Sequence, residues 1–238
     1  GGKTMWGKTC KGENGGKMSA AAWNRTVLLG TALMIAATAA VNIVIDPFWH
    51  YHGPLRTLQY PLNEQRYQND GIARHCDYGA VIAGTSMTEN FSASQFERLW
   101  GERAVKLPTS GATYREVSDQ LERAFSYNDS IRYVLRSMDG SRLIYAPDEY
   151  EYADYPEYLY DRNPFNDVQY VLNKAVLPQT LAVLNYTRAG NTTPTMDEYS
   201  SWSSYAEFGA EAVMAARPQL GEFTEEQVLT QEDLRNIQ

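Results

Sequence analysis

The most apolar stretch of the chain runs from Thr26 to Ile45 and carries no charged side chain. A run of about 20 apolar residues is long enough to cross a bilayer core as a helix. Lys17 and Arg25 precede the run and Asp46 follows it, so the positive-inside rule places the N-terminus in the cytoplasm and the rest of the chain outside. Two alternatives are a buried core helix and a signal peptide cut near Ala37-Thr38-Ala39. We expect a signal anchor, because the apolar run continues past that cleavage site.

The segments on either side of this run differ in character. Residues 1–17 are rich in glycine and lysine without periodicity, so we leave them out of the fold as a non-native or disordered leader and take 18–45 as cytoplasmic start and anchor. Residues 46–75 form a juxtamembrane segment whose aromatic residues, among them Phe48 and Trp49, fit a membrane–water interface. His50 and His52 suggest a metal pair, but no third ligand lies nearby, and the interfacial interpretation is preferred. A polar helix is expected within 63–75.

Residues 76–238 alternate between short apolar runs and amphipathic stretches. The apolar runs are 78–83, 104–107 and 131–138, and each ends in a turn that contains glycine. Helical patterns fill the two gaps between them, with Ser92 as the N-cap of the first and Gly101 as its stop. Strand–turn–helix units in succession predict right-handed crossovers and a parallel sheet.

In the second helical pattern, 114–125, one apolar face is expected. We predict that Val117, Leu121 and Phe125 point inward and that Arg115, Glu116, Glu122 and Arg123 point outward.

The remainder of the chain is less regular. Residues 146–161 are acidic and rich in tyrosine, which favours either a lid or aromatic platform for a sugar ring, or a solvated loop. A helix is predicted over 166–184 with a break at Pro178, a polar loop over 185–197, and a short helix over 208–217. A capping-box pattern at 224–227 starts a helix signal that no later strand uses, so we expect the domain to be C-terminally incomplete.

Composition narrows the function. The formal net charge of −8 argues against a nucleic-acid partner. Cys10 and Cys76 are far apart and lack metal-ligand spacing, so neither a disulfide framework nor a zinc site is expected. No cofactor is predicted.

Ser86 is the chief catalytic candidate. It follows the first strand in Gly84-Thr85-Ser86, and glycine at that point lets the backbone turn tightly. The carboxyl edge of an open α/β sheet is where ligands bind. A serine hydroxyl there can act as a nucleophile, with nearby backbone N–H groups for an oxyanion. The structural alternative is an ordinary polar turn.

With these junctions the chain resembles the SGNH (GDSL-like) hydrolases, and in particular membrane-anchored bacterial members that accompany cell-surface polymer modification. The resemblance covers about Tyr78 to Asp139. It makes Ser86 the nucleophile and Gly111 an oxyanion N–H donor, and it places Asp139 where the family has an asparagine. An ionised carboxylate accepts hydrogen bonds only, and would oppose an oxyanion. The family's Asp-x-x-His block is absent, because all three histidines precede Ser86; we expect the base to lie beyond Gln238.

The resemblance implies a fold and an activity. The fold would be a flavodoxin-like parallel sheet in three α/β/α layers after one transmembrane helix. The activity would be that of an extracytoplasmic esterase or acyltransferase acting on an acylated surface glycan or polymer, beside a membrane-bound acyltransferase. The alternatives are a non-catalytic, membrane-tethered binding or scaffold protein, and a phosphate- or nucleotide-binding sheet. The last is disfavoured because no glycine-rich phosphate loop of the usual spacing is present.

Overall fold

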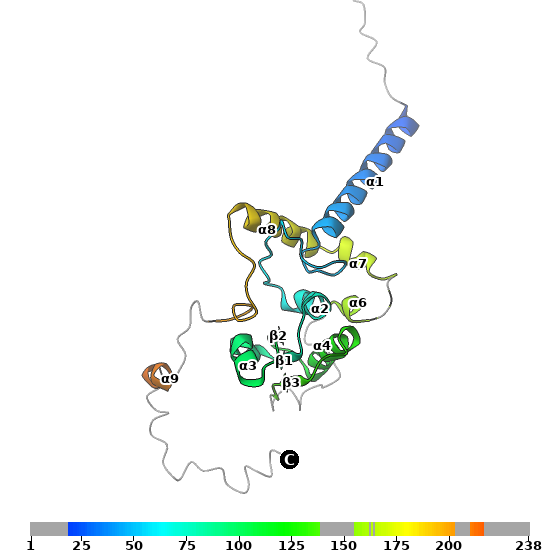
Figure 1. Ribbon diagram of the computed structural model, residues 1–238. Helices are drawn as coiled ribbons and strands as arrows, with labels where there is room; N and C mark the ends of the chain where they lie inside the picture. The colour runs from blue at the N-terminus through cyan, green and yellow to red at the C-terminus, as the bar shows by residue number, and fades with distance from the viewer. Residues whose placement is uncertain (1–18, 139–154, 162, 164, 203–209, 217–238) are drawn as a thin grey trace, which may run out of the picture.

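The computed structural model describes residues 19–138, 155–161, 163, 165–202 and 210–216. A long helix, α1, leads into a domain built around a small sheet (Figure 1). The elements in chain order are α1 (Ala20–Ile45), α2 (Gln65–His75), β1 (Ala80–Gly84), the 3-10 helix η1 (Ser86–Asn90), α3 (Ala93–Trp100), β2 (Ala104–Pro108), α4 (Tyr114–Tyr127), β3 (Tyr133–Arg136), α6 (Glu157–Tyr160), α7 (Val168–Val171), α8 (Val176–Arg188) and α9 (Ala210–Ala216).

The sheet has three parallel strands in the order β2-β1-β3. Side chains alternate between its two faces, as the pleat requires. Val81 and Ala83 of β1 pack in one cluster with the apolar faces of α2 and α4, whereas Ala80 and Ile82 pack with Ala93 and Phe96 of α3. Helices therefore cover both faces, and the prediction of a mixed α/β domain with a parallel sheet is confirmed at this level.

Helix α1 has 26 residues, with the Ser19 side chain accepting a hydrogen bond from the Ala22 N–H at its start. By length and composition it could cross a membrane. Most of it is exposed, but Asn42 and Ile45 in its last turn are buried against the domain. Asn42 Nδ2 donates to the Val171 carbonyl (2.9 Å), and its Oδ1 accepts from the Thr180 hydroxyl (2.8 Å). The end of α1 is thus part of the domain's packing.

The aromatic residues after α1 differ from their prediction. Phe48 and Trp49 are only 2% and 3% exposed, so they are core residues of the domain and the interfacial interpretation is wrong for them. The cause is Asp46, which takes a left-handed conformation (φ 46°) and ends the helix. The chain turns back toward α2, and Trp49 packs edge-on to Tyr60 in the same cluster as the sheet.

Helix α4 also corrects its prediction. Val117 and Leu121 are buried as expected, but Phe125 is 49% exposed. Glu116, predicted to point outward, is fully buried because it forms a capping box with Thr113 and accepts from Arg66 (3.2 Å). Arg123 likewise turns inward to pair with Asp70 (3.1 Å).

Helices α7, α8 and α9 agree only in part with the helices predicted from the sequence. Pro178 does not break the helix, because it lies in the first turn of α8, where a missing N–H leaves no hydrogen bond unmade. The break falls instead at 172–175, between α7 and α8. Helix α9 lies within the predicted 208–217. The leader, Asp139, residues 146–154 and the predicted helix signal after 224 lie outside the described residues.

Candidate functional site

Ser86 stands in the turn that leaves the central strand. Gly84 ends β1 with φ 156°, and a Cβ placed there would lie 2.6 Å from Ser137 Cβ and 2.7 Å from Thr88 Cγ2. Only glycine fits this junction without displacing its neighbours. Ser86 then opens η1 and is half-buried, and no side chain among the described residues hydrogen-bonds its hydroxyl.

The turn after β2 lies beside this junction. Gly84 and Pro108 are register partners, and the Thr109 N–H donates to the Gly84 carbonyl (2.9 Å). The Ala112 N–H closes the turn onto the Thr109 carbonyl (3.0 Å), with Gly111 left-handed at φ 69°. The structure therefore brings the Ser86 and Gly111 turns to the same edge of the sheet, while Asp139 lies beyond the described residues.

A chain of polar contacts links the two turns. Gln65, at the start of α2, accepts from the Ser110 N–H (2.6 Å) and donates through Nε2 to Glu89 in η1 (2.8 Å). The second oxygen of Glu89 accepts from the Trp202 indole N–H. Because Gln65 occupies the Ser110 N–H, that group is not free to hold an oxyanion. The sequence gives no sign of this bridge, since its members are distant along the chain.

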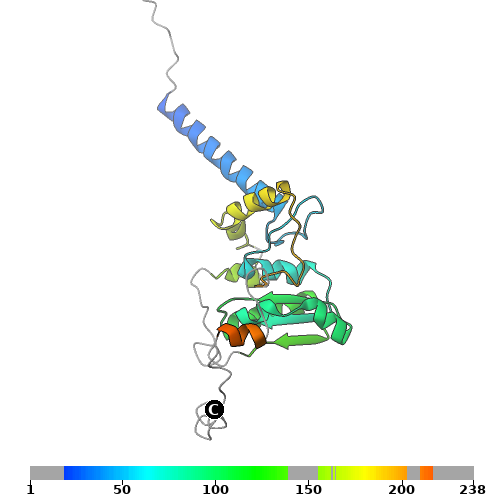
Figure 2. The ribbon, with the colours of Figure 1, turned by 90° about the vertical axis from the view of Figure 1, so that its left-hand side faces the viewer.

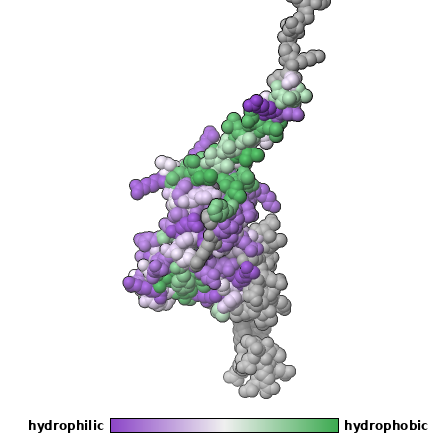
Figure 3. All heavy atoms as spheres, turned by 90° about the vertical axis from the view of Figure 1, so that its right-hand side faces the viewer, coloured by the Kyte–Doolittle hydropathy of each residue, from purple (hydrophilic) through white to green (hydrophobic). Residues whose placement is uncertain are grey.

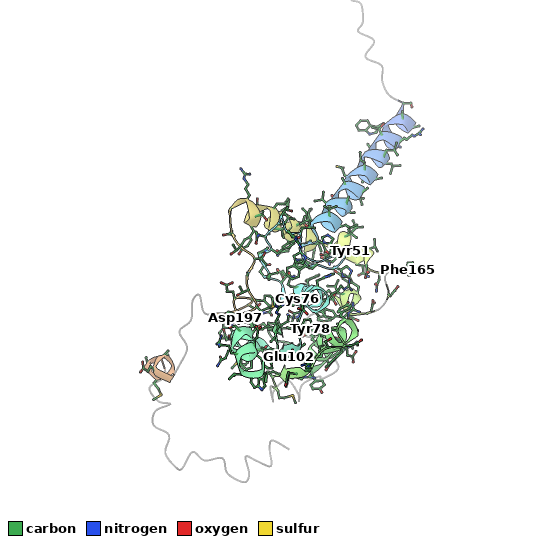
Figure 4. The ribbon with its side chains drawn as sticks, viewed as in Figure 1. Tyr51, Cys76, Tyr78, Glu102, Phe165 and Asp197 are labelled. Atoms are coloured by element: carbon green, nitrogen blue, oxygen red, sulfur yellow. The ribbon has the colours of Figure 1, made fainter. Side chains whose placement is uncertain are left out.

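Lys106 contacts the 3-10 helix η1, which contains Ser86 and Glu89. Its side chain is fully buried, and its ammonium donates to the backbone carbonyls of Glu89 (2.7 Å) and Asp197 (3.2 Å). Burial lowers the pKa of Lys106 to about 8, against the opposing influence of the Asp197 and Glu89 carboxylates. Asp197 lies beside α3 (Figure 4), where its carboxylate accepts from the Ser94 N–H (3.0 Å). Lys106 thus holds η1 and the segment around 197 together.

A second buried network fixes the β2 turn. Thr109 is fully buried, and its hydroxyl accepts from Asn69 Nδ2 (3.1 Å) and Gln120 Nε2 (2.5 Å). Asn69 also donates to the Pro108 carbonyl (2.8 Å) and accepts from the Tyr199 hydroxyl (2.7 Å). The network ties α2 and α4 to the β2 turn, and Gln120 Oε1 is its one buried oxygen without a hydrogen-bond partner among the described residues.

A wide groove of about 1240 Å³ lies beside the start of α2. Gln65 and Arg66 belong both to the groove and to the contacts of the β2 turn, since Arg66 donates to the Ser110 carbonyl (3.1 Å). The groove wall combines tyrosine rings, side-chain amides and a few charges, and the residues are Asn63, Glu64, Gln65, Arg66, Tyr67, Tyr155, Pro156, Glu157, Tyr158, Asp161, Asn166, Val168, Gln169, Leu172, Asn173, Lys174 and Ala175. The end of the tyrosine-rich 146–161 segment, where it is described, therefore contributes to a groove wall.

The three histidines lie away from the Ser86 turn. His50 is buried between Asp70 (Nδ1 to Oδ2, 3.9 Å) and Asp167 (Nε2 to Oδ2, 3.4 Å). Burial acts to raise the pKa of Asp70, but His50 and the guanidinium groups of Arg123 and Arg74 outweigh it and keep that pKa below its usual range. Asp70 and Arg74 are about one and a half and two and a half helical turns beyond Gln65 on α2, about 8 and 14 Å along its axis.

The other two histidines face the same region. His52 contacts the carbonyls of Gly53 (2.8 Å) and Ile43 (3.1 Å), and the backbone at Gly53 approaches His75. No group of three histidine, cysteine, aspartate or glutamate side chains in the described part of the chain could hold a metal ion. The histidines therefore tie the end of α1 to α2, and none of them is placed to accept a proton from Ser86.

Comparison with protein-family models gives no match for this chain. Searches of curated proteins and of solved structures likewise give no match.

Proposed function

We propose that this chain is a membrane-anchored serine esterase or acyltransferase that acts on an acylated cell-surface glycan or polymer. The observation that carries the proposal is the position of Ser86, in a glycine-dependent turn at the carboxyl edge of the central strand, beside the turn of Gly111. The resemblance to SGNH hydrolases, with their three-layer flavodoxin-like sheet, supports the same assignment.

In the proposed reaction, Ser86 Oγ attacks the acyl carbonyl and the acyl group is transferred to the serine. The N–H groups of Ser86 and Gly111 hold the oxyanion of the tetrahedral intermediate, an arrangement worth about 10²–10³ in rate per donor. The proton of the hydroxyl goes to a base from outside the described residues, and that base passes it to the leaving alcohol oxygen as the ester C–O bond breaks and the deacylated alcohol departs. Water or an acceptor hydroxyl then takes the acyl group from Ser86.

The groove suits a carbohydrate chain as the acylated substrate. Tyrosine rings offer apolar faces to sugar rings, and side-chain amides such as those of Gln169 and Asn173 offer donors and acceptors to hydroxyl groups. With α1 as the anchor and its N-terminus in the cytoplasm, the domain would work outside the cell membrane. A membrane-bound acyltransferase is the protein partner that this assignment implies.

A fluorophosphonate probe tests the nucleophile, applied to the full parent reading frame in membranes. We expect labelling of the wild type, loss of labelling in Ser86→Ala, and labelling retained in Ser110→Ala. Ser110 is an exposed serine on the neighbouring turn whose backbone, not its hydroxyl, makes the contacts described, so it is a matched control. Labelling that persists in Ser86→Ala, or a folded wild type that never labels, would refute the mechanism.

One observation favours a second function, that of a tethered glycan-binding protein without catalysis. Described residues from 63–67 and 155–175 line the groove, whereas all three histidines lie away from Ser86. This alternative predicts that surface glycan binds wild type and Ser86→Ala equally, in the absence of any probe labelling.

A further inference from the structure

Helix α8 carries a stripe of exposed leucines. Leu177, Leu181 and Leu184 are 38%, 51% and 41% exposed, and their spacing places them on one side of the helix. The buried side, with Val176, Thr180 and Val183, lies about 100° around the helix from this stripe. Helix α8 is therefore apolar on an exposed flank as well as on its packed face, which a helix that meets only water does not require.

The stripe lies where α1 enters the domain. Helices α7 and α8 both pack on the last turns of α1, through Val171 and Thr180, which contact Asn42. Phe165, ahead of α7, is also exposed (89%), whereas the exposed side chains of Val168 and Leu172 line the groove. We refer to the exposed flank of α8, within residues 176–188, as the collar. Figures 1 and 2 show α7 and α8 at the end of the domain from which α1 leaves, and in Figure 3 the green of α1 continues onto that end.

The length of α1 determines how close the collar lies to the bilayer. Seventeen residues separate Arg25 from Asn42, and at 1.5 Å per residue they span about 26 Å. The hydrocarbon core of a bilayer is about 30 Å thick, so this segment is a few ångströms too short to hold the domain clear of the membrane. A short span draws its flanking residues into the interface, and here the flanking residues are those of the collar.

Charge favours the same placement. Helix α8 contains no aspartate or glutamate and ends in exposed Arg188, although the chain as a whole has a formal net charge of −8. An apolar helix face with a basic residue at its border is typical of helices that lie in the headgroup region of anionic membranes. The long side chain of Arg188 can reach lipid phosphate while the leucines meet acyl chains.

We propose that the collar lies in the interfacial region of the bilayer, with Leu177, Leu181 and Leu184 against the upper acyl chains and Arg188 at the phosphates. The domain is then held on the membrane surface at two places, by α1 and by α8. The inference requires that α1 crosses the membrane, and it is independent of any chemistry at Ser86.

The full chain in vesicles of phosphatidylcholine and phosphatidylglycerol provides the test. A single environment-sensitive fluorophore is attached at Leu181→Cys, in a background in which Cys10 and Cys76 are serine. Leu99→Cys is the matched control, because Leu99 is an even more exposed leucine (64%, against 51% for Leu181) on α3, away from α1. Leu33→Cys, in the middle of α1, reports on the span itself. Each variant is first shown to retain the melting temperature of the parent.

We expect the fluorophore at position 181 to emit at shorter wavelength and to be quenched several-fold by lipid spin-labelled near the headgroup. The fluorophore at 33 should be quenched best by lipid labelled deep in the chain, and that at 99 by neither. The proposal would be overturned if the fluorophore at 181, like that at 99, is not quenched by either lipid. A blue-shifted but unquenched fluorophore at 181 would also overturn it, since a second copy of the chain or another protein would then cover the stripe. If the fluorophore at 33 is not quenched, α1 does not cross the membrane and the proposal is overturned. Serine-probe labelling of the same vesicles reports separately on Ser86.

Discussion

Asp46 is predicted to be one of the most sensitive single positions in the domain. Its carboxylate is fully buried and accepts four hydrogen bonds. Three come from the backbone N–H groups of His50 (2.9 Å), Tyr51 (2.7 Å) and His52 (2.9 Å), and the fourth comes from the Tyr170 hydroxyl (2.7 Å). Asp46→Ala removes every acceptor at once, and so it disconnects the loop after α1 from α7.

The loss can be estimated donor by donor. The His50 N–H and the Tyr170 hydroxyl are buried, and each buried donor left without a partner costs about 1–3 kcal/mol. The N–H groups of Tyr51 and His52 are partly exposed, so water can replace the carboxylate there. Alanine at φ 46° adds about 1–2 kcal/mol of backbone strain. The sum is about 3–8 kcal/mol, against a typical total stability of about 5–15 kcal/mol.

Two further variants separate the contributions to this estimated loss of stability. Asp46→Asn keeps the shape, the tolerance of a left-handed backbone and one acceptor oxygen, so it should cost less than Asp46→Ala by about the strain and one hydrogen bond. Tyr170→Phe removes one donor to Asp46 and the acceptor of the Phe48 N–H (3.2 Å), and should cost about 1–3 kcal/mol.

The assay is urea unfolding of the full chain in detergent, followed by tryptophan fluorescence, to which buried Trp49 beside this loop contributes. We expect the wild type to have the highest free energy of unfolding, Tyr170→Phe and Asp46→Asn to have intermediate values, and Asp46→Ala to have the lowest. A value for Asp46→Ala within about 1 kcal/mol of the wild type would refute the reasoning, because it would mean that the four donors find water or other acceptors at little cost.

Two further predictions concern the edge of the sheet. Gly84→Ala should destabilise the domain by at least about 1–3 kcal/mol, since its Cβ would lie 2.6 Å from Ser137 Cβ. The control is Gly101→Ala, which introduces left-handed strain but has open space around its Cβ. Gly84→Ala should lower the melting temperature more than Gly101→Ala, and an equal decrease would contradict the predicted clash. In a Cys76→Ser background the free energy of unfolding should rise between about pH 8 and the onset of tyrosine ionisation near pH 10, because the pKa of Lys106 is lowered to about 8 in the fold and the unfolded chain binds its proton more tightly over that window. Cys76 is replaced because burial raises the pKa of its thiol to about 11, which lowers the free energy of unfolding over the same window. Lys106→Met should flatten that rise, measured by urea unfolding across the window, and an unchanged slope would show that Lys106 is not its source.

Local signals explain what the sequence predicts well. The Ser92 hydroxyl accepts from the Gln95 N–H (3.0 Å), and Gly101 ends the helix at φ 73°, as the pattern of α3 indicates. Such caps use residues within one turn of each other, so their chemistry can be read from neighbours in the sequence. The three strands also lie within their predicted ranges to one or two residues, because short apolar runs bounded by glycine and polar residues are sufficient to mark them.

The misplaced residues are those whose partners are far away in the chain. The sequence places Phe48 and Trp49 at the membrane surface because an apolar helix precedes them, yet their ring partners are Tyr60, Tyr67 and Tyr170. Lys106 and Glu89 would be expected at the surface by residue type, and both are buried. The Lys106 ammonium finds carbonyl acceptors on segments 17 and 91 residues away, a pairing that no local pattern encodes. The groove cannot be predicted from the sequence for the same reason, since its walls come from two segments, 63–67 and 155–175, that are far apart in the chain.

The contacts of α2 show that anchor and site belong to one packed unit. At its start, Gln65 holds the turns that follow β1 and β2. At its middle, Asp70 meets His50 of the loop that Asp46 organises. That loop continues directly from α1, whose Asn42 is fixed to α7 and α8. The boundary between anchor and domain therefore falls inside α1, before Asn42, because a chain shortened to begin at Asp46 would remove Asn42 from the buried Val171 carbonyl and Thr180 hydroxyl. Since α2 spans the distance between that boundary and the Ser86 turn, the anchoring that we propose for α1 implies that its orientation in the membrane also sets the orientation of the groove and the sheet edge toward the bilayer.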